Sequence, residues 1–200
     1  MQLEPYPEKS GYRVWLSGRN EDTIIEYYDE EPTEQLAIRA GLHGLRADEI
    51  PWVRTEGIRR LDTEQKAYKL RVRDGKTGWR EVPVSRDFVK QIRMMKNAKG
   101  LTQEDPVIDV SKRTVQRCAE RAGDTLAEQD GHTDDWQHLT FHDLRRTWAT
   151  RIYYSLDAHY AESIIMRWGG WTDQDTFRTS YLGRESDTMA AEMMGDANIL

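Results

Sequence analysis

The stretch that decides the fold is residues 142–150, which read His-Asp-Leu-Arg-Arg-Thr-Trp-Ala-Thr. Four apolar side chains in and around it recur at the spacing of an α-helix: Phe141, Leu144, Trp148 and Ile152. The sequence therefore predicts a helix that buries this face in the core. His142 and Arg145 are three residues apart, so both side chains can lie on one face of that helix. A core helix that presents an imidazole and a guanidinium together indicates a site as well as a fold.

Most of the remaining chain also has helical periodicity. Thr33 is the expected cap of the first helix, and Ser85 and Ser111 begin two later ones. A glycine pair at 169–170 ends the helix that follows the central one. In chain order, the further helices that we expect are 34–42, a short one from about 47, 85–96, 111–128, 164–168, 176–181 and 189–194.

A smaller part of the sequence alternates with period two, as strands do. Polar and apolar residues alternate on both sides of the turn residues 74–78, which predicts a β-hairpin over 67–84 with Lys76 at its tip. Pro83 favours an edge strand, and residues 57–60 can add a third strand. The first thirty residues have no clear pattern. The expected fold class is mainly α with a small antiparallel β-sheet (α+β).

Composition limits the class of protein. Cys118 is the only cysteine, so the chain cannot form an internal disulfide, which fits a reducing compartment. No apolar run approaches the roughly 20 residues that a membrane span needs. The N-terminus lacks the basic and then apolar segments of a secretory signal. We therefore expect a cytoplasmic protein that does not bind membranes.

The charge balance is acidic and poor in lysine. The formal net charge is −6, and the 29 basic residues comprise eight lysines and 21 arginines. Such a surface is one way to stay hydrated in concentrated salt, so we hypothesise a salt-adapted host such as a halophilic archaeon or its virus. An ordinary acidic cytoplasmic protein is the alternative. An activity optimum at low salt, with the fold intact there, would count against the hypothesis.

Four segments far apart in the chain each offer groups that bind or activate phosphate. They are Gly44-Leu45-Arg46 with Glu49, the predicted hairpin tip with Lys76, the pair His142 and Arg145, and Trp171 with Tyr181 ten residues later. Any one segment is a weak signal, since a single arginine or loop lysine is usually a solvated surface residue. The ordered set of all four is much more specific.

These segments resemble the catalytic domain of the tyrosine recombinases, the phage integrase family, over about residues 36–182. The resemblance implies DNA strand cleavage and rejoining through a 3′-phosphotyrosyl intermediate, with Tyr181 as the nucleophile. It also implies that Lys76 acts from the hairpin on the minor-groove side of the DNA. The domain organisation that we expect is an N-terminal arm (1–35), a catalytic domain (36–184) and a C-terminal helix or tail (185–200) that docks on a neighbouring protomer or on its own core.

Physical chemistry supports these roles independently. A phenol with a pKa near ~10 needs activation at neutral pH, and nearby positive charge favours its phenolate. Arg46 and Arg145 can hold the phosphate oxygens with paired, charge-assisted hydrogen bonds. A desolvated lysine suits proton donation to the departing deoxyribose oxygen.

The other candidate residues have supporting roles. His142 can accept the phenol proton or bind the phosphate, and Trp171 can donate one hydrogen bond through its indole. Glu49 can orient Arg46, and Arg146 can contact backbone phosphate.

The sequence calls for no cofactor in this chemistry. Its histidines do not fall with cysteines or carboxylates at a metal-ligand spacing, so we expect no metal. The expected partners are double-stranded DNA and further copies of the chain, as a dimer or tetramer. About 35 residues precede the first motif, so an accessory DNA-binding protein can also take part. The alternatives are a DNA-binding protein that does not cut and an enzyme like a type IB topoisomerase.

Overall fold

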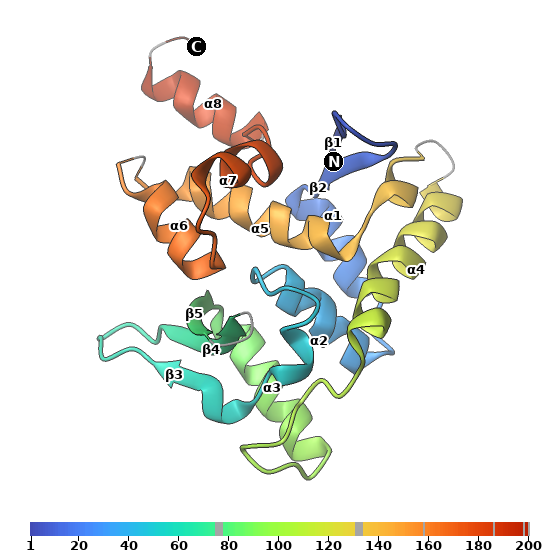
Figure 1. Ribbon diagram of the computed structural model, residues 1–200, viewed down its shortest axis with the longest axis vertical. Helices are drawn as coiled ribbons and strands as arrows, with labels where there is room; N and C mark the ends of the chain where they lie inside the picture. Colours follow the sequence, from blue (N-terminus) through green and yellow to red (C-terminus); the bar gives the residue numbers. More distant parts are fainter. Residues whose placement is uncertain (75–77, 131–133, 158, 186, 198, 200) are drawn as a thin grey trace.

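The computed structural model describes residues 1–74, 78–130, 134–157, 159–185, 187–197 and 199. Helix α5 (Phe141–Ser155) lies at its centre and contacts α2 (Pro32–Gly41), α4 (Lys112–Asp130) and α6 (Ala161–Gly169) (Figure 1). A capping box between Thr140 and Asp143 begins this central helix.

The predicted apolar face of α5 is confirmed. Phe141, Leu144 and Trp148 are buried, and Ile152 is half-buried against the same core. The central helix is therefore both the middle of the core and the support of His142 and Arg145.

The sheet is three-stranded and antiparallel, in the order β3 (Ile58–Arg60), β4 (Tyr68–Asp74), β5 (Gly78–Val84). The predicted hairpin, the third strand and the edge position of Pro83 are confirmed. One face of the sheet joins the core, and β5 contacts α6. Lys76 lies outside the described residues, so its position at the hairpin tip stays a prediction.

The first thirty residues, which had no readable pattern, contain three elements. Strands β1 (Gln2–Pro5) and β2 (Tyr12–Trp15) form an antiparallel hairpin, and α1 (Gly18–Glu26) follows with Ser17 in a capping box. This segment contributes Val14, Ile24 and Tyr28 to the core. It packs as part of the molecule's body, and the boundary that we expect at residue 35 stays a prediction.

Strand β2 is held to the central helix through side chains. The backbone N–H of Val14 donates to Asp143 Oδ1 (3.1 Å), and that of Leu16 donates to Thr147 Oγ1 (2.9 Å). Two polar residues of the 142–150 stretch thus satisfy strand N–H groups that would otherwise be buried without partners.

Two expectations about the helices were wrong, one about a cap and one about a short helix. Helix α2 begins at Pro32 after Glu31, so Thr33 is not its cap; proline suits the first helical position because its missing N–H would be unpaired there anyway. The short helix expected from about residue 47 is a single 3₁₀ turn, η1 (Ile50–Trp52).

The remaining elements lie close to their predicted ranges. Helix α3 (Arg86–Ala98) follows Ser85, whose Oγ accepts from the N–H of Phe88 (3.2 Å). Helix α8 (Asp187–Asp196) projects from the helical body at the C-terminal end (Figure 1). In the described part of the chain, no helix is both long and apolar enough to span a membrane. The elements not yet given are η2 (Thr55–Gly57), η3 (Asp134–His138) and α7 (Gln174–Ser180).

Candidate active site

A buried carboxylate organises the first part of the site. Glu49 accepts hydrogen bonds from the backbone N–H of Arg46 (2.6 Å) and from its Nη1 (2.8 Å). The same carboxylate accepts from Arg80 Nε (3.2 Å) and Nη2 (2.6 Å). The side chains of Glu49 and Arg80 are each 4% exposed, whereas that of Arg46 is 29% exposed. The Glu49 carboxylate therefore binds Arg46 and a second arginine, Arg80, at the same time, and its role in orienting Arg46 for chemistry stays a prediction.

Arg145 lies beside this cluster and is almost fully buried. Its Nη1 donates to the carbonyl of Gly44 and its Nη2 to that of Gly169, which also accepts from Arg46. Burial, and then the positive charges of Arg80 and Arg46, lower the pKa of Arg145 to about 9, so it stays protonated at neutral pH. Its Nε has no partner among the described residues. A buried cation with an unpaired N–H suits an anionic oxygen as ligand.

Two glycines make room for these contacts. Gly44 has φ +82°, and a Cβ there would lie 2.5 Å from the ring of Trp148. Gly170 ends α6 in the left-handed region at φ +71°. Both glycines present their carbonyls to arginines: Gly44 to Arg80 (3.1 Å) and Gly170 to Arg46 (2.8 Å). Gly44 and Gly170 thus supply carbonyl acceptors that hold the guanidinium groups in place.

Three aromatic side chains meet next to Arg145. The guanidinium carbon of Arg145 lies 4.0 Å from the ring centre of Trp171. The Tyr181 ring packs edge-on against Trp171, with centres 4.5 Å apart, and against His142, with centres 5.1 Å apart. The indole Nε1 of Trp171 is buried and has no acceptor among the described residues. It is a second unpaired donor beside the Arg145 guanidinium.

The backbone around Tyr181 is fixed from two sides. Its carbonyl accepts from Trp15 Nε1 (3.0 Å) and from Thr150 Oγ1 (3.1 Å). One residue earlier, the carbonyl of Ser180 accepts from Arg146 Nε (2.8 Å). These donors pair with carbonyls at the end of α7 that have no partner within the helix. Tyr181 is therefore placed by strand β2 and helix α5 together.

His142 is positioned as a neutral imidazole. Loss of surrounding water, and then the positive charges of Arg146 and Arg145, lower the pKa of His142 to about 3. The side chain of His142 is exposed at the pocket, and the positive charges of Arg146, Arg145 and Arg46 act on it there. A neutral imidazole beside a tyrosine ring can accept a proton at physiological pH.

The structure brings Arg46, His142, Arg145, Trp171 and Tyr181 together from three of the four segments; the hairpin tip with Lys76 lies outside the described residues. The surface pocket at this place is lined by Arg46, His142, Arg145 and Arg146, with Tyr6 and Lys9 from the N-terminal hairpin loop.

Two arginines of the site have partners that the sequence did not reveal. Arg146 forms a buried ion pair with Asp143, and its predicted contact with DNA stays a prediction. Arg80 is the site residue that sequence reasoning missed. The sequence did contain a sign of its role. Arg80 is two and four residues before the buried Val82 and Val84, so it lies on the same, apolar face of β5.

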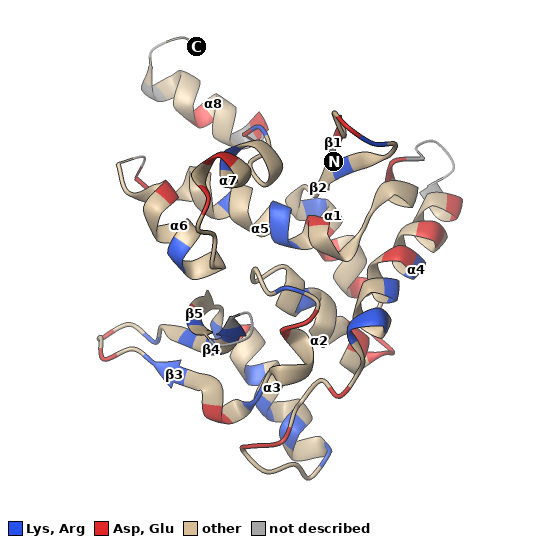
Figure 2. Ribbon diagram, in the orientation of Figure 1, with Lys and Arg blue, Asp and Glu red and all other residues tan. Residues whose placement is uncertain are grey.

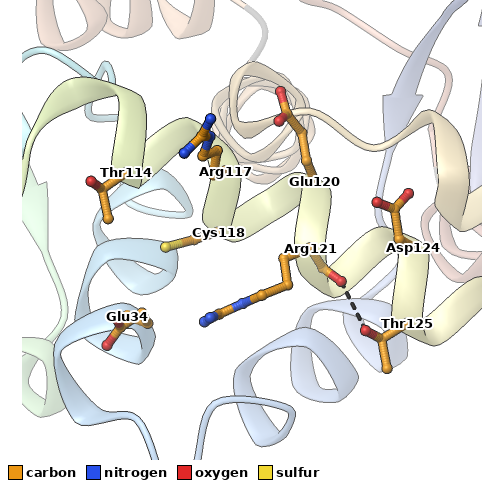
Figure 3. A pocket seen from close by; sticks show the side chains of 8 residues that line it. All are labelled: Glu34, Thr114, Arg117, Cys118, Glu120, Arg121, Asp124 and Thr125. Carbon is orange, nitrogen blue, oxygen red and sulfur yellow. Dashed lines mark hydrogen bonds between the residues drawn. The ribbon is translucent and has the colours of Figure 1, made fainter.

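A second hollow lies along α4, facing α2, and has a different character (Figure 3). Its residues mix both signs of charge, and Arg121 is already paired with Glu31 (2.6 Å). Burial raises the pKa of the Cys118 thiol to about 11, so this cysteine is a poor nucleophile. No group of metal-ligating side chains occurs among the residues described. The pocket at His142 is therefore the candidate active site.

A family model described as the phage integrase family matches residues 15–185. A search among curated proteins finds no match.

Solved structures with the same fold include the XerA recombinase, at 18% identity and a TM-score of 0.66, covering 92% of this chain and 65% of that one. A XerH site-specific recombinase bound to a palindromic difH substrate has 14% identity and a TM-score of 0.65, covering 90% and 52%. A lambda integrase tetramer bound to a Holliday junction has 21% identity and a TM-score of 0.57, covering 90% and 52%. The chain thus spans about half to two thirds of the length of these proteins.

Proposed function

Because this chain belongs to the phage integrase family, we propose that it cleaves and rejoins DNA strands, with Tyr181 as the nucleophile. The observation that carries the proposal is the convergence of Arg46, His142, Arg145 and Trp171 around one tyrosine. Two of these residues, Arg145 and Trp171, contribute buried N–H donors that have no acceptor among the described residues. Such donors suit the non-bridging oxygens of a phosphodiester, which gain negative charge in the transition state.

The first step is an exchange of one phosphate ester for another. The phenol oxygen of Tyr181 attacks the phosphorus and gives its proton to the neutral imidazole of His142. The bond from phosphorus to the 5′-oxygen breaks, which leaves a 3′-phosphotyrosyl bond and a 5′-hydroxyl. Lys76 is the proposed donor of the proton that this departing oxygen takes up. No nucleotide is consumed, because the phosphotyrosyl ester keeps the energy of the broken ester.

The rejoining step reverses this chemistry. A 5′-hydroxyl, from the same or another strand, attacks the phosphotyrosyl phosphorus and releases the phenol. Arg46 and Arg145 hold the phosphate throughout, and Glu49 keeps Arg46 in place. Trp171 cannot exchange a proton at neutral pH, so its part is to donate one hydrogen bond and to pack against the Tyr181 ring.

The test is covalent capture on a nicked or suicide DNA substrate, in high and low salt, read on a denaturing gel. We expect an adduct with the unaltered protein and none with Tyr181→Phe, which keeps the ring and removes the attacking oxygen. Tyr153→Phe, which alters a half-buried tyrosine near the C-terminal end of α5, is the matched control and should leave the adduct unchanged.

The competing functions give different results in the same assay. DNA binding with no adduct at any salt concentration would favour the DNA-binding protein that does not cut. Relaxation of supercoiled DNA by single protein molecules, without pairing of two sites, would favour activity like a type IB topoisomerase.

We also propose that the chain assembles with further copies on double-stranded DNA through its C-terminal helix. Helix α8 projects from the body, and Met193 and Met194 on it are 53% and 39% exposed. An exposed apolar helix surface suits docking on a neighbouring protomer. Action on genomic DNA is consistent with the cytoplasmic location that the sequence predicts.

A further inference from the structure

The face of the sheet that points away from the core carries a concentration of positive charge and tryptophan. Side chains alternate between the two faces of a strand, so the residues paired with one another across β3, β4 and β5 share this face. Here Arg59 is opposite Lys69, Arg71 is opposite Glu81, and Arg73 is opposite Trp79. The adjoining turn η1 adds Trp52, and Arg54 follows just before η2, with its guanidinium carbon 5.2 Å from the Trp52 ring centre. We define the outer sheet face as Trp52, Arg54, Arg59, Lys69, Arg71, Arg73, Trp79 and Glu81.

The tryptophans on this face are unusually exposed, at 43% for Trp52 and 56% for Trp79. The ring of each tryptophan contacts an arginine guanidinium. The guanidinium carbon of Arg71 lies 4.7 Å from the Trp79 ring centre, and that of Arg73 lies 4.8 Å from the Trp52 ring centre. Stacking on an indole restricts a long flexible side chain and still allows its guanidinium to donate hydrogen bonds to a ligand. The arginines are thereby ordered in advance of any ligand.

The positive charge on the outer sheet face is only partly neutralised by the residues that the structure describes. Glu81 is its acidic member, and both of its oxygens accept from Arg59, at 2.8 and 2.6 Å. Arg71 and Arg73 form no ion pair with any residue that the structure describes. Figure 2 shows Lys and Arg gathered on the strands β3 and β4. In a chain with a net charge of −6, a cluster of unpaired, pre-ordered cations indicates a polyanionic ligand.

We infer that the outer sheet face binds the phosphate backbone of duplex DNA outside the point of cleavage. The inference rests on the proposed function only in taking DNA as the polyanion. Trp79 and Arg80 are adjacent in β5 and point to opposite faces, so one strand contributes both to the active-site cluster and to this second surface. Guanidinium groups contact phosphate oxygens without reading bases, so this surface adds affinity without sequence preference.

The test measures DNA affinity against salt concentration for the full chain, with Tyr181→Phe in every protein so that no cleavage occurs. The variant is Arg71→Gln with Arg73→Gln, and the matched control is Arg19→Gln with Arg86→Gln, which changes the net charge equally at exposed positions elsewhere. Removing one cation that neutralises a phosphate lowers the slope of log affinity against log salt by about 0.9. We expect the variant's slope on a long duplex to fall by roughly 1.8, and the control's slope to stay unchanged.

Two results would overturn the inference. One is an equal slope for variant and unaltered protein, or an equal fall in variant and control, because the effect would then be one of net charge. The other comes from Trp79→Ala: if it weakens binding to a single-stranded oligonucleotide more than to duplex, the tryptophans stack on unpaired bases instead. A thermal midpoint like that of the unaltered protein shows that each variant folds.

The proposed cleavage is tested separately, on a duplex just long enough to cover the active site. With Tyr181 restored, the variant should form as much adduct on this duplex as the unaltered protein. A missing adduct in both proteins, together with the expected change in slope, would reject the proposed cleavage and leave the DNA-binding face supported.

Discussion

Arg80 gives the clearest prediction at the scale of single residues. It shares the Glu49 carboxylate with Arg46 and the Gly44 carbonyl with Arg145, so it positions both arginines without facing the pocket itself. Arg80→Lys keeps the charge, but an ammonium group cannot bond several acceptors at once as the planar guanidinium does. We expect it to lower the rate of adduct formation about tenfold or more, which corresponds to roughly 1.4 kcal/mol, while DNA affinity changes little.

A second variant separates positioning from simple stability. Arg80→Met removes one partner of a buried ion pair, which typically costs about 3–5 kcal/mol in the free energy of unfolding. Chemical denaturation of both variants checks this. If Arg80→Lys were as destabilised as Arg80→Met, or if its adduct formed at the normal rate, the positioning role would be refuted.

Local sequence patterns could predict some of these residues and not others. Arg46, His142, Arg145, Trp171 and Tyr181 fall in short motifs whose spacing is visible in the chain. Other contributions exist only through contacts between distant segments. Trp15 is an example, because the Tyr181 carbonyl that it binds lies 166 residues away.

At the scale of elements, the helices and the three-stranded sheet were predictable because each buries one face in a regular period. The N-terminal hairpin was not. The N–H groups of Val14 and Leu16 pair with side chains of α5, so little in the strand's own sequence specifies them. The Thr33 cap failed for a related reason. A proline beside it fixes the backbone for helix one residue earlier, and this outweighs the preference of threonine for a cap.

His43 gives a prediction about pH at the junction of α2 and α3. Its Nδ1–H donates to the carbonyl of Arg39 (2.7 Å), and its Nε2 accepts from the N–H of Ser85 (3.2 Å). Burial lowers the pKa of His43 to about 4 from an ordinary value of 6.5. The unfolded chain therefore takes up this proton first as the pH falls. The contribution of His43 to the free energy of unfolding is constant above pH 6.5. It falls as the pH drops from 6.5 to 4.

The measurement is the free energy of unfolding against pH for the unaltered protein and His43→Gln, which keeps a donor and an acceptor but does not titrate. The unaltered protein should lose up to about 3 kcal/mol more than the variant between pH 6.5 and 4. His142 titrates in both proteins, so the difference isolates His43. Parallel curves would show that His43 is not the acid-sensitive group.

At the scale of the whole molecule, we expect α8 to contribute to assembly on DNA but little to the stability of the fold. Because it projects from the body, deleting residues 185–200 should leave the thermal midpoint within a few degrees of the original. The same deletion should reduce the size of the complexes that form on DNA, measured by sedimentation. Met193→Ser with Met194→Ser keeps the helix and removes its apolar surface, so it should reproduce the effect. Unchanged complex size in both proteins would disprove docking through α8.

The hydrogen bond from Trp15 to the Tyr181 carbonyl has a practical consequence. Trp15 is 4% exposed, and its indole N–H is fixed to the peptide unit of the proposed nucleophile. Indole fluorescence responds to the polarity and hydrogen bonding around the ring. Any movement of the tyrosine segment as the chain closes on a substrate must stretch this bond or carry the indole with it. The fluorescence of Trp15, obtained as the difference between the unaltered protein and Trp15→Phe, should therefore report that movement without an attached dye.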